Sequence, residues 1–199
     1  MDINKIEIKV GGYVACKSSF YSAITSINST LVLTRGINRF ECEIDAEYWA
    51  ISYLLSMYDD NDDFILDENP IIIVDGKDIN IKDILKYTCY MDKINPEFSS
   101  NETVETLVAK GIKQYNLSYT TEDIRDMFYM EDFRFKRPLS GVGNEVFKAM
   151  GAIGFVNQKE IFCMPWLSRK RFDGFHLHLI GAINILEKLG KTIIVPIGR

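Results

Sequence analysis

The sequence lacks the features that mark membrane, secreted and zinc-binding proteins. No stretch approaches the roughly 18 consecutive apolar residues that a membrane-spanning helix needs. The first ten residues alternate polar with apolar side chains, where a signal peptide would have an unbroken apolar run. The four cysteines are far apart and form no CxxC pair. We therefore expect a cytoplasmic protein with no direct membrane insertion, no disulfide framework and buried free thiols.

Positive charge is also scarce, which argues against nucleic acid as a partner. The chain has 23 Lys and Arg against 28 Asp and Glu, a net charge of -5 that repels phosphate backbones. Its one dense basic triplet, Arg169 to Arg171, has no interleaved aromatic platform of the kind that single-strand binders use. We expect this triplet to be solvated.

Residues that would carry metal or hydrolytic chemistry are few. His176 and His178 are the two histidines, and on a helix their rings point about 200° apart. No cysteine or carboxylate set completes a ligand shell around them, so no metal site is expected. No G-x-S-x-G elbow is present, and an acyl-transfer enzyme is not indicated.

What the sequence does contain is typical of an ordinary globular protein. Its 199 residues, 47% of them apolar, are enough to bury one core. Residues Ile3–Val10 alternate in the manner of a strand, which Gly11 and Gly12 end. We predict a helix at Ser18–Ile27, a meander of two short strands at Leu31–Ile44 and a mostly buried helix at Glu47–Tyr58.

The second half of the chain is predicted to be mainly helical and to end on a strand. A short buried strand at Pro70–Val74 precedes an Asp75-Gly76 turn, and helical periodicity begins near Asn101. Further on we predict an amphipathic helix at Gly143–Phe155, a strand at Glu160–Met164, one long helix from Phe172 to Leu186 and a buried strand at Thr192–Ile197. The order strand, helix, strand implies a parallel pair.

The segment Gly11–Ser18 (GGYVACKS) matches G-x-x-x-x-G-K-[ST] except that Cys16 replaces the second glycine. It follows a predicted strand and opens a predicted helix, which is the context of a phosphate-binding loop. Such a loop surrounds a phosphate with backbone N–H groups, places its lysine on the terminal phosphates and its hydroxyl on magnesium. The candidate nucleotide-binding residues here are Gly11, Gly12, Cys16, Lys17 and Ser18.

Four later segments lie in the order seen in ATP-binding cassette (ABC) ATPases, and the chain resembles that family over most of its length. Tyr87–Asp92 (YTCYMD) resembles the strand that leads to the glutamine loop, and Leu139–Gly143 (LSGVG) resembles the LSGGQ signature. Glu160–Pro165 (EIFCMP) resembles the Walker B strand, and Gly190–Gly198 (GKTIIVPIG) resembles the closing segment. Ser140 and Gly141 join the candidate nucleotide-binding residues, at a helix N-terminus that is a second anion site.

The resemblance implies an α/β fold with a P-loop NTPase-like mixed sheet, flanking helices and a helical subdomain at about residues 100–150 of a single domain, 1–199. It also implies a partner, which is an ABC permease, a second cassette or a second copy of the chain in a homodimer. Such a partner would hold the protein at the inner face of the membrane. ATP and magnesium are the ligands that the family binds.

Departures from the family pattern fall on residues that have roles in hydrolysis. Cys163 stands where the family has the aspartate that holds magnesium, and Met164 stands where it has the glutamate that activates water. Magnesium prefers oxygen ligands, and neither sulfur group can accept a proton from water near neutral pH. We therefore expect no catalytic residue, no required cofactor, and weak or absent nucleotide binding.

Two other hypotheses stay open at this point. The chain could be a stand-alone interaction or assembly protein with no nucleotide role, which uses an apolar surface around Trp166, Phe172 and Phe175. It could also be an enzyme with chemistry that the sequence does not reveal.

Overall fold

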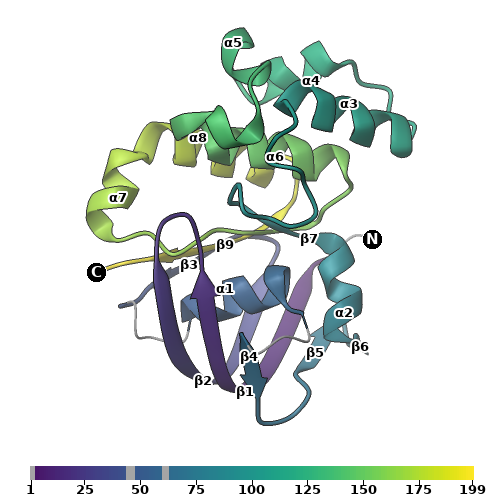
Figure 1. Ribbon diagram of the computed structural model, residues 1–199. Coiled ribbons are helices and arrows are strands. Elements are labelled where there is room, and N and C mark those ends of the chain that lie inside the picture. The colour runs from purple at the N-terminus through teal and green to yellow at the C-terminus, as the bar shows by residue number, and fades with distance from the viewer. Residues whose placement is uncertain (1–2, 44–47, 60–62) are drawn as a thin grey trace.

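The computed structural model describes residues 3–43, 48–59 and 63–199. Two β-sheets stack with one helix between them, and further helices cover the other side of the second sheet (Figure 1). The ends of the predicted elements at Ile44 and Glu47 lie outside the described residues.

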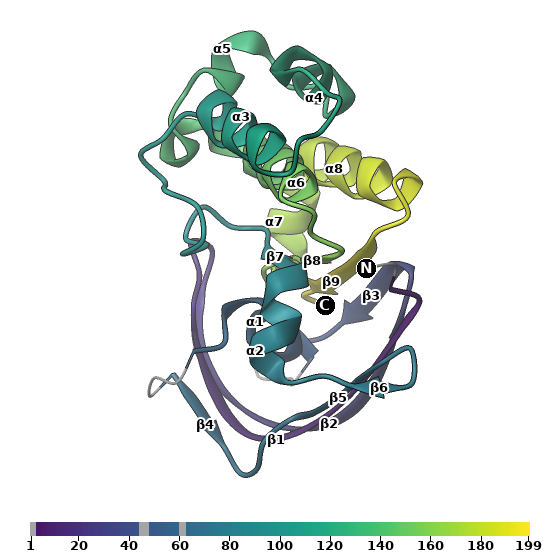
Figure 2. The same cartoon turned by 90° about the vertical axis from the view of Figure 1, so that its right-hand side faces the viewer.

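The first sheet is antiparallel and has the strand order β2-β1-β5-β6, with β4 also paired to β1. Its strands are β1 (Lys5–Lys17), β2 (Ser22–Thr34), β4 (Phe64–Leu66), β5 (Ile71–Val74) and β6 (Lys77–Asp78). Figure 2 shows that β1 and β2 curve as a long arc beneath the helix at the centre of the molecule. The Asp75-Gly76 turn between β5 and β6 has positive φ at both residues, as the sequence predicts.

The second sheet is parallel throughout, with the order β3-β9-β8-β7. Its strands are β3 (Gly36–Glu41), β7 (Thr88–Tyr90), β8 (Ile161–Cys163) and β9 (Thr192–Ile197). Successive side chains enter opposite cores, because strand residues alternate between faces. Ile193 and Val195 belong to the core under the C-terminal helices, whereas Ile194 belongs to the core shared with the antiparallel sheet.

Helix α1 (Tyr48–Met57) lies between the two sheets. Its residues Trp49–Leu55 are all buried, because one side of the helix faces each sheet. A short helix α2 (Ile81–Ile84) and a 3-10 turn η1 (Leu85–Tyr87) lead into β7.

The remaining helices cover the other face of the parallel sheet. They are α3 (Val104–Gln114), α4 (Thr121–Met127), α5 (Asp132–Phe135), the 3-10 turns η2 (Leu139–Gly141) and η3 (Gly143–Glu145), α6 (Val146–Val156), α7 (Arg169–Gly174) and α8 (His176–Lys188). Helices α6 and α8 pack side by side above the sheet, and α3, α4 and α5 lie farther out (Figures 1 and 2). No helix among the described residues is both long and apolar enough to cross a membrane.

Three predicted elements are wrong. The meander of two short strands expected at Leu31–Ile44 does not form, because β2 and β3 belong to different sheets. The helix expected at Ser18–Ile27 is instead a turn followed by β2, and Ser18 N–H donates to the Tyr21 carbonyl at 2.9 Å to close that turn. The single long helix expected from Phe172 to Leu186 is divided into α7 and α8. The strands at the end of the chain and the helix α6 are confirmed.

Candidate functional site

The segment Gly11–Ser18 does not form a phosphate-binding loop. Gly11 to Lys17 lie inside β1, and each is paired with a residue of β2. A strand directs its N–H groups to neighbouring strands, so they cannot surround a phosphate. Lys17 Nζ lies 3.1 Å from a carboxylate oxygen of Asp63. The predicted loop and helix are therefore wrong, and the strand predicted at Ile3–Val10 does not end at Gly11 and Gly12 but continues to Lys17 as β1.

Gly12 instead allows the close approach of β4. Gly12 has φ 136°, and a Cβ at this position would lie 2.3 Å from the carbonyl oxygen of Ile65. Only glycine adopts this backbone conformation readily. Cys16 is buried in the core between the sheets, where burial raises the pKa of its thiol to about 12.

The parallel sheet does provide a strand that is followed by a helix, namely β3 followed by α1. A phosphate-binding loop joins a strand of such a sheet to the following helix, and ligands of these folds bind beyond the carboxyl ends of the strands. The sequence that joins β3 to α1 is C-E-I-D-A-E, from residue 42 to residue 47. It contains three carboxylates and neither glycine nor lysine.

Backbone groups at the start of this connection form hydrogen bonds with other parts of the chain. Cys42 N–H donates to the Ile197 carbonyl at 2.8 Å, and the indole N–H of Trp166 donates to the Cys42 carbonyl at 3.1 Å. Burial raises the pKa of the Cys42 thiol to about 11. These hydrogen bonds join the start of the connection to residues from the C-terminal part of the chain.

Two sulfur-containing residues, Cys163 and Met164, lie at the carboxyl end of β8, and magnesium prefers oxygen ligands. Cys163 and Met164 are buried, and burial raises the pKa of the Cys163 thiol to about 12. The Met164 carbonyl accepts a hydrogen bond of 2.7 Å from the Ser52 hydroxyl of α1. Throughout the part of the chain that the structure describes, no group of three or more His, Cys, Asp or Glu residues could hold a metal ion.

A buried glutamate, Glu145, lies in sequence between the second predicted anion site, Leu139–Gly143, and α6. Ser140 and Gly141 are exposed in the turns that precede α6. The first turn of α6 follows Glu145, whose buried side chain lies 4.0 Å from Lys148 Nζ. Glu145 therefore stands at the position where the helix dipole favours a carboxylate.

A cavity of about 170 Å³ lies between the β1–β2 turn, the residues after β7 and the start of α6. It brings Ser19 and Phe20 together with Ser140, which sequence reasoning assigned to a separate segment. The buried carboxylate of Asp92 accepts the Ser19 N–H at 2.8 Å, and Phe20 stacks on Phe147. Cofactor pockets usually exceed about 300 Å³, so this cavity is too small to enclose a nucleotide.

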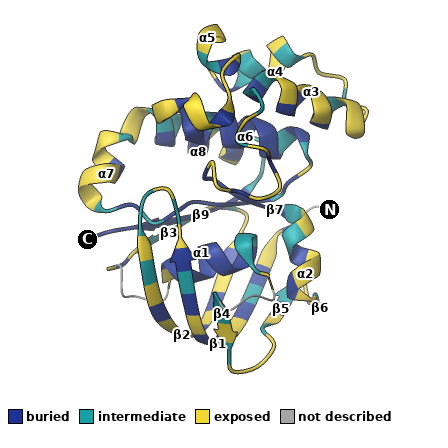
Figure 3. Cartoon of the chain, viewed as in Figure 1, coloured by how far each residue is buried: buried dark blue, intermediate teal, exposed yellow. Residues whose placement is uncertain are grey.

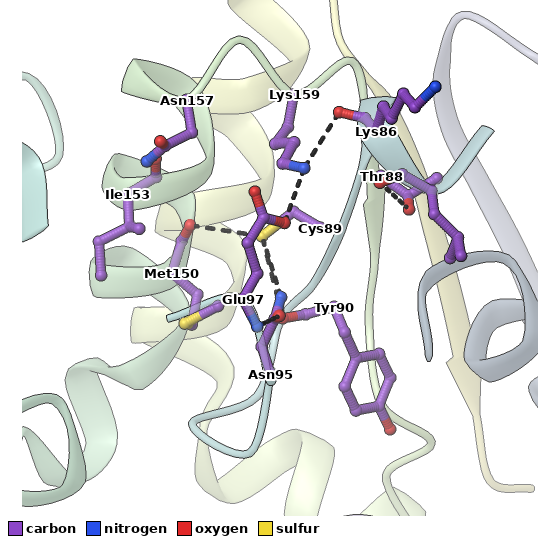
Figure 4. Close-up of polar contacts among 11 residues, drawn as sticks. Lys86, Thr88, Cys89, Tyr90, Asn95, Glu97, Met150, Ile153, Asn157 and Lys159 are labelled. Carbon is purple, nitrogen blue, oxygen red and sulfur yellow. Dashed lines mark hydrogen bonds and ion pairs between the residues drawn. The ribbon is translucent and has the colours of Figure 1, made fainter. Parts of the chain in front are cut away.

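A polar network that the sequence did not reveal holds the segment after β7 (Figure 4). The Lys159 side chain is 4% exposed, lies 2.7 Å from a Glu97 carboxylate oxygen and donates to the Lys86 carbonyl at 3.0 Å. The Asn95 amide donates to the Tyr90 carbonyl at 3.2 Å. The network therefore ties the chain between β7 and α3 to the end of α6.

The three rings expected to form an apolar surface, Trp166, Phe172 and Phe175, differ in exposure. Phe172 is buried, so such a surface does not include it. Phe175 is partly buried and packs edge-on against Phe20 and Phe147. Trp166 is half-buried against Tyr21. An interaction role for the partly exposed rings of Trp166 and Phe175 stays a prediction.

No protein-family model matches the sequence, and no curated protein matches it. Solved structures do match. A putative ABC transporter ATP-binding protein from Pyrococcus furiosus is 15% identical with a TM-score of 0.61, and the match covers 97% of this chain and 90% of that one. An ATP-binding cassette of an ABC transporter in its ADP conformation is 9% identical with a TM-score of 0.61, over 100% and 82% of the two chains.

A third solved structure is cbiO1 from Clostridium perfringens, part of the ABC transporter complex cbiONQ. It is 12% identical with a TM-score of 0.57, over 100% of this chain and 80% of that one. The chain thus has the fold of an ABC ATPase domain, and the predicted fold class is confirmed.

Proposed function

We propose that the chain is a catalytically inactive ABC ATPase-like subunit that binds no nucleotide and acts by pairing with protein partners. The observation that carries this proposal is the sequence between β3 and α1. Glu43, Asp45 and Glu47 stand where a P-loop has its glycines and lysine. Three acidic residues in this connection give it a net negative charge, which opposes the binding of a triphosphate.

The end of β8 supports the same conclusion for catalysis. Cys163 and Met164 offer neither an oxygen ligand for magnesium nor a base for the attacking water. Loss of a general base alone lowers the rate by about 10²- to 10⁴-fold. The chain would then have the fold of an ABC ATPase domain but lack the residues that bind the nucleotide and hydrolyse it.

ATP turnover tests the catalytic part of the proposal. We expect phosphate release by the purified chain in Mg-ATP to equal the buffer background, and Lys17→Ala to leave it there. Turnover above background that persists through further purification, and that a Glu43→Gln or Lys17→Ala substitution changes, would contradict the proposal.

The partner that the fold suits is an ABC permease or a second cassette, at the inner face of the membrane. Support comes from the neighbours in structure, which are named as subunits of ABC transporters. Fold alone does not fix a function, so the partner is tested directly. We expect the tagged chain to co-purify with a permease or an intact cassette encoded beside it. Co-purification with neither would remove the transport role and leave the inactive fold.

A further inference from the structure

The cavity of about 170 Å³ beside the β1–β2 turn has an apolar floor. Three apolar residues of its lining are buried, namely Leu139, Val142 and Val146. The rings of Phe20 and Phe175 also line it, are half-buried and pack edge-on against each other. Small-molecule sites usually combine apolar walls of this kind with a few polar groups, so the floor suits the apolar part of a ligand.

The rim of the cavity is polar. Its exposed lining residues include Ser19, Lys93, Ser140 and Asn144. Among the residues that the structure describes, none forms a hydrogen bond or an ion pair with these four side chains. The β1–β2 turn on one side of the rim is exposed or half-buried (Figure 3). The donors at the rim are therefore open to a ligand from solvent.

Positive charge lies around the rim. Lys93 is itself a lining residue, and the Arg171 guanidinium donates to the carbonyl of Phe20, which is another. Arg134 Nη1 lies 3.3 Å from the position that a Cβ would take at Gly143, a third lining residue. Cations grouped in this way favour an anionic group at the mouth of the cavity.

The buried carboxylate of Asp92 determines which end of a ligand faces the floor. Its two oxygens accept the Ser19 N–H at 2.8 Å and the Ile94 N–H at 3.4 Å. Because Asp92 is fully buried, a ligand cannot reach its carboxylate, and its negative charge opposes an anion at the floor. A bound anion therefore has its charged group at the rim and its apolar part on the floor.

We propose that this cavity binds a small carboxylate whose apolar part is about the size of a benzene ring. A cavity of about 150 Å³ holds one benzene molecule, and this one also opens at a polar rim. Lys93 donates a charge-assisted hydrogen bond to the carboxylate, and the Ser140 hydroxyl and the Asn144 amide supply further donors. The apolar part packs against the rings of Phe20 and Phe175.

This site goes beyond the proposed function. The ligand is smaller than a nucleotide, and the connection between β3 and α1 takes no part in binding it. Failure of the inference would therefore leave the absence of nucleotide binding and catalysis untouched.

A titration of the isotope-labelled full chain with sodium benzoate, followed by NMR, tests the site. We expect saturable shifts at the amides of Ser140, Val142 and Val146, with a millimolar or tighter dissociation constant. Benzyl alcohol, which has the ring without the charge, should bind about 3- to 10-fold more weakly. Acetate and inorganic phosphate lack the apolar part and should give no saturable shift at these amides.

A charge-removing variant separates the role of Lys93 from a general change in structure. Lys93→Gln should weaken benzoate binding about 3- to 10-fold and leave the affinity for benzyl alcohol unchanged. Lys113→Gln is the matched control, because Lys113 is an exposed lysine of α3 that does not line the cavity. It should change neither affinity.

The absence of a saturable shift with benzoate, or shifts confined to residues away from the cavity, would overturn the inference. Equal affinities for benzoate and benzyl alcohol would do so as well, because the rim would then not select a carboxylate. Phosphate binding at the same amides as tightly as benzoate would reduce the site to a general anion site. These wild-type titrations decide the question even if Lys93→Gln does not fold.

Discussion

Gly12 combines a left-handed backbone with a neighbour that leaves no room for a side chain. Its φ is 136°, and β4 passes so close that a Cβ would meet the Ile65 carbonyl oxygen. We predict that Gly12→Ala lowers the free energy of unfolding by about 2 to 4 kcal/mol, because strain and clash add. Urea denaturation measures the change.

Gly141→Ala is the control for that substitution. No atom lies within 4 Å of a Cβ built at Gly141, and its φ is not positive. Gly141→Ala should change the free energy of unfolding by less than about 0.5 kcal/mol. Equal effects of the two substitutions would contradict the close approach of β4.

The thiols of Cys16 and Cys163 share one environment, the core between the sheets. Burial raises the pKa of each to about 12 from an ordinary value near 9. An acid whose pKa is raised by folding stabilises the protein fully below its unfolded pKa, and that stability is lost as the pH rises from about 9 to 12.

We therefore predict that the free energy of unfolding falls above pH 9, by about 1 kcal/mol per thiol for each pH unit. Urea denaturation at several alkaline pH values measures this slope, and Cys16→Ala should reduce it. A slope that Cys16→Ala leaves unchanged would show that other groups dominate. At pH 8 the native protein should also resist thiol-modifying reagents until it unfolds.

At the scale of elements, the β1–β2 hairpin shows where sequence reasoning failed. The alternation that starts at Ile6 continues through Val14 and Cys16, with Gly12 on the buried face. Paired glycines are typical of the end of a strand, but glycine can also mark the close passage of another strand. In β2 the buried positions include Thr25 and Ser29, and these polar residues hide the period of two.

The elements of the parallel sheet were easier to predict. Strands β8 and β9 are short runs of buried apolar residues bounded by glycine and proline, and α6 has apolar residues at helical spacing. Each of these signals lies within a few consecutive residues. The pairing of strands that are distant in sequence leaves no such local signal, and the Lys159 network depends on that pairing.

That network sets the position of the segment that leads to α3. We predict that Glu97→Gln lowers the free energy of unfolding by about 1 to 2 kcal/mol, because the buried Lys159 ammonium loses its charged partner while the half-exposed carboxylate is replaced. Hydrogen exchange at residues 92–98 should rise as well. Glu7→Gln, which breaks the exposed pair with Lys5, is the control and should change neither. Equal responses of the two variants would contradict an anchoring role.

For the whole molecule, the fold class could be predicted because segments in the second half occur in the order of an ABC ATPase, and the matched structures have that fold. The place where a phosphate-binding loop would lie in this fold could not be predicted. The motif-like string is in β1, whereas the connection between β3 and α1 contains no such motif. Only the sheet order identifies that connection, because it shows that β3, not β1, belongs to the parallel sheet.

We propose that this chain binds no nucleotide, and isothermal titration with Mg-ATP measures such binding directly. We expect no saturable heat up to millimolar ATP, with the same result for ADP and for Glu43→Gln. Saturable binding of one nucleotide per chain, weakened when magnesium is removed, would contradict it.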